Sequence, residues 1–220
     1  DRSLRWVNDM LDQHRPSVPE HPVRRAALIR LDDILHIEAA PAQKLLQDWL
    51  RARMDNAAQE IEAARVSQGA RIWKLYNHTF FIKTASSAFV YDLVPGPPKI
   101  PAMAMTPAAL EKIVRAADAL FVSHWHDDHA NAAVGEMFFA QNKPVLGPPD
   151  IWRDKPELRA KLISPERSTT KLHRAGRLEY FALPGHQGEP ITNNCNLVKT
   201  PEGFTFLQTG DQSNESDFAW

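Results

Sequence analysis

The sequence contains very little cysteine: Cys195 is the only one among 220 residues. A single thiol cannot form an internal disulfide, and it cannot supply the several thiolates of a cysteine-based metal site. Cys195 has no histidine paired with it in a recognisable motif, so we expect a small buried residue at a strand start rather than a nucleophile. Apolar runs of membrane-spanning length are missing as well, which excludes a transmembrane helix within this sequence.

An excess of either charge is also missing, because 26 lysine and arginine residues stand against 27 aspartate and glutamate residues. This balance argues against a broad basic surface for nucleic acid, although a local patch stays open. Hydrophobic residues make up 43% of the chain, enough for the core of one large domain or of one domain with an appendage. We expect a soluble protein, either cytoplasmic or secreted or periplasmic after loss of a signal peptide.

Residues 1–70 show helical periodicity. Apolar residues recur at intervals of three and four between Leu45 and Ile61, in a segment that Pro41 can start and Gly69 can end. We therefore expect a helical N-terminal extension over residues 1–70. Its apolar stripe is expected to pack on the following domain or on a second chain.

From Arg71 onward the period changes to that of short strands bounded by polar turns. Helices are expected after Thr106, which can cap a helix with Pro107 at its first position, and also from Asn131 and near Pro156. Strands are expected at residues 71–76, 80–84, 88–93, 119–123, 143–147, 178–183, 196–199 and 204–209. Strands followed by mixed strands and helices predict an α/β domain in which helices cover sheets.

The segment SHWHDDHANA, residues 123–132, holds three of the nine histidines of the chain and two aspartates within six positions. Imidazole and carboxylate are standard ligands of zinc and similar ions, whereas a group of unneutralised aspartates would repel itself. On a helix His126 would point almost opposite to His124 and Asp128, while an extended turn places these three on one side. The segment therefore predicts a metal-binding turn.

A metal site needs ligands from more than one segment, and two distant residues fit this need. His186 follows a predicted strand within LPGHQG, and Asp211 follows another within LQTGDQS. Both residues stand behind a glycine in a turn after a strand, as the histidine cluster stands after its own strand. Loops at strand ends commonly carry catalytic residues, so we expect all three segments to meet.

The spacing His-x-His-x-Asp-His, met by His124, His126, Asp128 and His129, resembles the signature of the metallo-β-lactamase superfamily. The resemblance covers roughly residues 71–220, and the later histidine and aspartate follow in the same order. It implies an αβ/βα sandwich. It also implies that Asp92, at the end of the strand FVYDL, supports the metal site from behind its ligands.

Carried over to this sequence, the resemblance implies two zinc ions, with iron or manganese as further candidates. Their ligands would be His124, His126 and His186 for the first ion, Asp128 and His129 for the second, and Asp211 as a bridge between the two. The family's final histidine has no counterpart, because no histidine follows His186. We therefore expect a chain truncated at its C-terminus. His78 and His173 stand out of order and are not expected to replace that ligand, so the second ion would bind weakly.

The function implied by the resemblance is hydrolysis of an ester, lactone, β-lactam-like amide or phosphodiester bond in a small-molecule substrate. A metal-bound hydroxide would attack, and Asp128 would hold its proton. Two other classes stay open: an iron-dependent oxidoreductase of the same superfamily, and a non-catalytic metal-binding domain. The N-terminal helices or an open sheet edge could also mediate association with a second chain.

Overall fold

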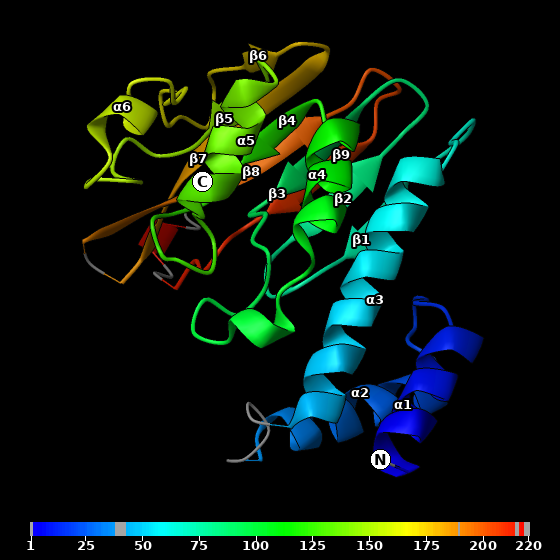
Figure 1. Ribbon diagram of the computed structural model, residues 1–220. Coiled ribbons are helices and arrows are strands. Elements are labelled where there is room, and N and C mark those ends of the chain that lie inside the picture. The colour runs from blue at the N-terminus through cyan, green and yellow to red at the C-terminus, as the bar shows by residue number, and fades with distance from the viewer. Residues whose placement is uncertain (1, 38–42, 189, 214–215, 218–220) are drawn as a thin grey trace. The chain divides into compact units, whose positions relative to one another are not determined.

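The computed structural model of the protein describes residues 2–37, 43–188, 190–213 and 216–217 (Figure 1). The chain divides into two compact units, Asp1–Arg53 and Met54–Trp220. None of the described helices combines the length and the apolar character that a membrane crossing requires.

The first unit is helical, as the periodicity of this region predicts. It contains α1 (Arg2–Gln13), α2 (Pro22–Leu35) and the first half of α3 (Lys44–Ala63). Small and medium apolar side chains from the three helices are buried within it, namely Leu4, Val7, Ala27 and Leu46. The indole of Trp49 donates to Asn8 Oδ1 over 3.0 Å and joins α3 to α1.

The second unit contains a five-stranded sheet in the order β1–β2–β3–β4–β5. Its strands are β1 (Arg71–Lys74), β2 (Phe80–Lys83), β3 (Ala88–Tyr91), β4 (Ala119–Phe121) and β5 (Val145–Leu146). The first three strands pair antiparallel, and β3, β4 and β5 pair parallel. The strands expected in this part of the sequence are confirmed, each shortened by one to three residues at its ends.

A second sheet has the order β6–β7–β8–β9 and is antiparallel throughout. Its strands are β6 (His173–Ala175), β7 (Leu178–Gln187), β8 (Ile191–Lys199) and β9 (Thr205–Gln208). The sequence did not indicate β6, and β7 and β8 are longer than expected. Their pairing runs through Gly185↔Asn193 and His186↔Thr192, so the expected sharp turn before His186 is wrong.

Alternation along the strands of the first sheet creates two cores. Phe81, Val90 and Leu120 face one side, where they meet apolar residues of α3, of α4 (Pro107–Ala116) and of α5 (Ala132–Ala140). Phe89 and Phe121 face the other side, where the core consists of strand residues from both sheets. The described layers are therefore helices, a first sheet and a second sheet, which is the α/β class that the sequence predicts (Figure 1).

The helices over the first sheet begin where the sequence predicts. Thr106 Oγ1 accepts the Ala109 amide at the start of α4 (Pro107–Ala116), and Asn131 Oδ1 accepts the Val134 amide at the start of α5 (Ala132–Ala140). A short 3₁₀ turn (Pro101–Met103) precedes α4, and α6 (Pro156–Arg159) follows β5. Such caps satisfy amide groups that have no partner inside the helix.

The single cysteine gives a test of the core of the second sheet. Cys195 lies inside β8 opposite Leu183 and is fully buried, as expected, although not at the strand start. Burial raises the pKa of its thiol to about 11, despite the nearby charge of Arg167. At pH 8 the thiolate is then a fraction on the order of one in a thousand, because three pH units separate the two values.

We therefore predict that Ellman's reagent leaves the native protein unmodified at pH 8 over an hour. The same protein in 6 M guanidinium should react with one equivalent within minutes, since unfolding exposes the thiol and returns its pKa to about 8.5. Rapid reaction of the native protein would contradict the buried position of Cys195.

Candidate metal centre

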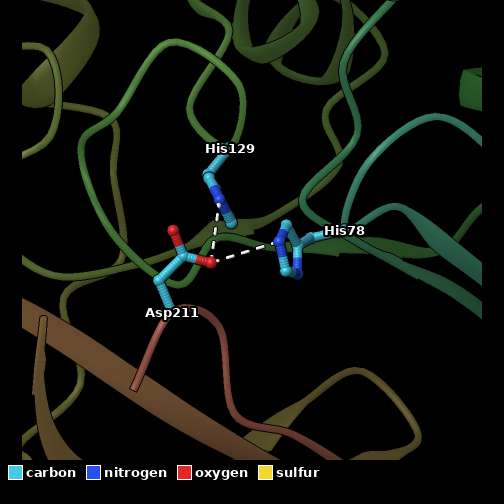
Figure 2. A group of neighbouring side chains, drawn as sticks. All are labelled: His78, His129 and Asp211. Atoms are coloured by element: carbon cyan, nitrogen blue, oxygen red, sulfur yellow. Dashed lines mark ion pairs between the residues drawn. The ribbon is translucent and has the colours of Figure 1, made fainter. Parts of the chain in front are cut away.

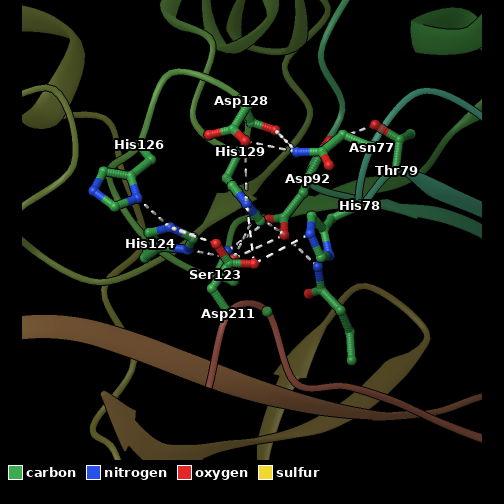
Figure 3. Close-up of polar contacts among 12 residues, drawn as sticks. Asn77, His78, Thr79, Asp92, Ser123, His124, His126, Asp128, His129 and Asp211 are labelled. Carbon is green, nitrogen blue, oxygen red and sulfur yellow. Dashed lines mark hydrogen bonds and ion pairs between the residues drawn. The ribbon is translucent and has the colours of Figure 1, made fainter. Parts of the chain in front are cut away.

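Four segments of the second unit meet at one edge of the first sheet (Figure 3). Asp92 follows β3, and the histidine turn follows the parallel neighbour β4, so both leave the sheet at the same end. Asp211 follows β9 of the second sheet. His78 lies in the turn between β1 and β2, and it reaches the same end because Phe80 at the start of β2 pairs with Tyr91 at the end of β3.

The histidine turn is not extended: its backbone bends at residues 124–126 and forms a turn at residues 127–129. The amides of His129 and Ala130 both donate to the carbonyl of His126, at 2.9 and 2.8 Å, and close a tight turn. The expectation that His124, His126 and Asp128 alternate onto one side is therefore wrong beyond His126. Within this turn the side chains of His124 and His129 are both buried.

Asp92 is the buried carboxylate behind this turn. Its Oδ1 accepts the Ser123 amide at 2.7 Å, and its Oδ2 accepts the Ser123 hydroxyl at 2.7 Å and the Gln208 side-chain amide. Nδ1 of His129 lies 2.8 Å from the same Oδ2. A hydrogen bond from Nδ1 to a carboxylate fixes the tautomer and directs Nε2 outward as a ligand atom.

Nε2 of His129 is buried and has no hydrogen-bond partner among the residues that the structure describes. Its nearest carboxylate oxygens are Asp211 Oδ1 at 3.4 Å and Asp128 Oδ2 at 3.9 Å. Burial works to lower the pKa of His129, but the hydrogen bond to Asp92 and the surrounding aspartates outweigh it and raise the pKa. The environment of His129 therefore favours a positive charge next to Nε2, which a proton or a metal ion can provide.

His124 and His126 form the other side of the site. Nε2 of His124 lies 2.9 Å from Nδ1 of His126, and Nδ1 of His124 lies 3.0 Å from the Ser123 hydroxyl. Burial, followed by the neighbouring His129, lowers the pKa of His124 to about 4. His124 is therefore neutral at pH 7, which is the state in which imidazole binds a metal.

Asp211 lies between two groups of histidines. Its Oδ1 lies 3.2 Å from Nε2 of His78 and 3.4 Å from Nε2 of His129, and its Oδ2 lies 3.8 Å from Nε2 of His124. Two groups of ligand atoms result, each with all members within 4.8 Å of one another: His78, His129 and Asp211, shown in Figure 2, and His124, His126 and Asp211.

Of the six ligands predicted from the sequence, the structure brings His124, His126, His129 and Asp211 together. Asp128 lies at the rim, where its carboxylate accepts the Asn77 side-chain amide at 2.7 Å, and it belongs to neither group. One further residue, His78, lies with these four, although the sequence did not lead us to expect it as a ligand.

His186 belongs to neither group of described ligand atoms. Its Nδ1 lies 3.0 Å from Asp217 Oδ2, and its amide donates to Gln212 Oε1. The pairing of β7 with β8 holds the backbone of His186 opposite Thr192. His173 also lies apart, with its Nε2 2.9 Å from the carbonyl of Glu166.

The buried carboxylate predicts how the site depends on Asp92. The change Asp92→Asn removes the negative charge and replaces one carboxylate oxygen by an NH2 donor, which cannot accept a hydrogen bond from Nδ1 of His129. It should therefore lower zinc affinity about 10–100-fold. Competition with a chromophoric chelator measures this affinity. Asp154→Asn, at an exposed position, is the control and should leave it unchanged. Equal affinities in the two variants would contradict the role of Asp92.

No protein-family model and no curated protein matches the sequence. Among solved structures, the chain is similar to CmlA, a diiron β-hydroxylase from Streptomyces venezuelae (18% identity, TM-score 0.48), covering 68% of this chain and 31% of that one. It is also similar to YhfI, a metallo-β-lactamase fold protein from Bacillus subtilis (17% identity, TM-score 0.44), covering 66% of this chain and 58% of that one. A third similar structure is a possible metal-dependent hydrolase from Veillonella parvula (16% identity, TM-score 0.48), covering 70% of this chain and 66% of that one. The chain spans about one third to two thirds of the length of these proteins.

Proposed function

We propose that this chain is a metal-dependent hydrolase whose centre is built on His124, His126, His129 and Asp211. The observation that carries the proposal is the buried Nε2 of His129, which has no hydrogen bond among the described residues and which the carboxylate of Asp92 directs at Asp211. A buried nitrogen without a partner costs about 1–3 kcal/mol. A metal ion at this point would remove that cost.

The donor set supports a divalent metal ion. Imidazole nitrogens and carboxylate oxygens suit zinc, iron and manganese. In a tetrahedral shell with metal–nitrogen distances of about 2.0–2.1 Å, neighbouring ligand atoms lie roughly 3.3 Å apart. Nε2 of His124 and Nδ1 of His126, at 2.9 Å, need to separate only slightly to share an ion.

A bound divalent ion supplies two functions: it polarises the bond under attack, and it lowers the pKa of a water molecule to about 7. Side-chain nucleophiles are poorly placed to compete. The hydroxyl of Ser123 donates to Asp92, and the thiol of Cys195 is buried with a raised pKa. Asp128 can accept a proton at the rim, where Asn77 holds its carboxylate 3.9 Å from Nε2 of His129.

A cavity of about 420 Å³, lined in part by His78, indicates which class of substrate the site would accept. Apolar side chains, among them Phe80, Tyr91 and Phe206, form much of its wall. No lysine or arginine is among the described residues that line it. Such a wall suits the apolar part of an ester or lactone better than the charged backbone of a phosphodiester, so we propose the former class.

Iron chemistry is the second candidate, because a set of histidine and carboxylate donors without sulfur suits iron as well as zinc. In that case the same side chains would serve an oxidoreductase. Metal content and oxygen consumption distinguish the two functions, since hydrolysis consumes no oxygen.

We predict that the purified protein hydrolyses an ester or lactone from a panel that also holds β-lactams and phosphodiesters. Chelation should abolish the activity, and added zinc should restore it. Replacing both His124 and His126 by alanine should lower kcat/KM at least about 100-fold, because the ligands of one ion are lost. His173→Ala is the control, and it should keep full activity.

Hydrolysis that persists after chelation would contradict the proposal. Metal-dependent oxygen consumption without hydrolysis would replace it with the oxidoreductase.

A further inference from the structure

We infer that His78, a residue outside the expected ligand order, is a metal ligand. Together with His129 and Asp211 it forms a second metal position beside the one at His124 and His126. The inference deepens the proposed function and rests on it for the first position. It replaces the expectation that this chain lacks a ligand for the second ion.

The distances fit one coordination shell. Nε2 of His78 lies 3.2 Å and Nε2 of His129 lies 3.4 Å from the same oxygen, Asp211 Oδ1 (Figure 2). Ligand atoms around a tetrahedral ion are expected roughly 3.3 Å apart. The two imidazole rings stack with centroids 4.6 Å apart and planes 26° apart, so both nitrogens approach the carboxylate from the same region.

A simple ion pair between His78 and Asp211 explains less of this arrangement. A protonated His78 would satisfy Asp211 Oδ1, but Nε2 of His129 would remain buried without a hydrogen bond to any described residue. A proton on His129 would satisfy that atom and leave His78 as an incidental neighbour. One metal ion satisfies all three groups at once, and only the ion requires both histidines.

The turn that carries His78 is fixed at both sides. Asn77 adopts a left-handed conformation with φ +50°, and its side chain donates to Asp128 Oδ2 at 2.7 Å. Thr79 is buried, and its hydroxyl donates to the carbonyl of Asp92. Asn77 thus joins the turn to the histidine cluster and Thr79 joins it to the strand end at Asp92, with His78 between them (Figure 3).

Asp211 is placed to bridge the two positions. Its Oδ1 faces His78 and His129, while its Oδ2 lies nearer to His124 and accepts the Gln187 side-chain amide at 3.0 Å. Gly210 makes this approach achievable, because it has φ +55° and a Cβ there would lie 2.6 Å from Cβ of Ser123. A two-ion site with one shared carboxylate follows.

The test is a metal titration of chelator-stripped full chain, read by zinc stoichiometry and by the visible absorption of the cobalt-substituted protein. The wild type should bind two ions per chain. His78→Ala and His78→Phe should keep the first ion and bind the second at least about 10-fold more weakly. The phenylalanine variant keeps a ring against His129 without a ligand nitrogen, and it therefore separates ligation from stacking. His173→Ala should bind two ions.

Circular dichroism of each variant confirms that the fold is kept. Two tight ions in His78→Phe, or a single ion in the wild type, would overturn the inference while leaving the proposed function intact. A wild type that binds no metal at all would overturn the proposed function itself.

Discussion

The carboxylate of Asp92 is the constraint on which the rest of the site depends. It is fully buried at the end of β3, and it accepts hydrogen bonds from the backbone and hydroxyl of Ser123 after β4 and from Gln208 of β9. One charge therefore joins two neighbouring strands of the first sheet to the second sheet. A buried carboxylate is tolerable only when its oxygens are well paired, so the three segments that meet at Asp92 have little freedom to separate.

The geometry of the ligands follows from this anchor. Nδ1 of His129 lies against Asp92, and its Nε2 must then face Asp211. Ser123, held by the same carboxylate, contacts Nδ1 of His124 and leaves Nε2 of that ring free to face His126. The polar groups behind the site thus decide which nitrogen each histidine offers, and an ion entering the site would meet oriented ligands. Because these ligands are assembled only in the folded chain, binding of an ion should also stabilise the fold.

Much of this arrangement was predictable from the sequence, because it depends on local patterns. Periodicity and short motifs predict the strands of the first sheet, the caps at Thr106 and Asn131 and the histidine cluster. The support from Asp92 was implied only by the family resemblance. The positions of His186 and His78 could not be predicted from the sequence, because they depend on pairing between distant residues. The pairing of β7 with β8 extends far enough to place His186 inside a strand. The antiparallel pairing of β2 with β3 brings the turn that carries His78 to the end of the first sheet where the other metal ligands lie. A turn histidine gives no sign in the sequence of which sheet end it will reach.

The most direct test of a metal centre organised by Asp92 is a crystal structure of the zinc-loaded chain with anomalous diffraction recorded above and below the zinc edge. We expect two anomalous peaks on either side of Asp211, one contacted by His124 and His126 and the other by His129 and His78. Nδ1 of His129 should remain bonded to Asp92. Zinc bound elsewhere in the chain, with the histidine turn free of anomalous density, would contradict the account.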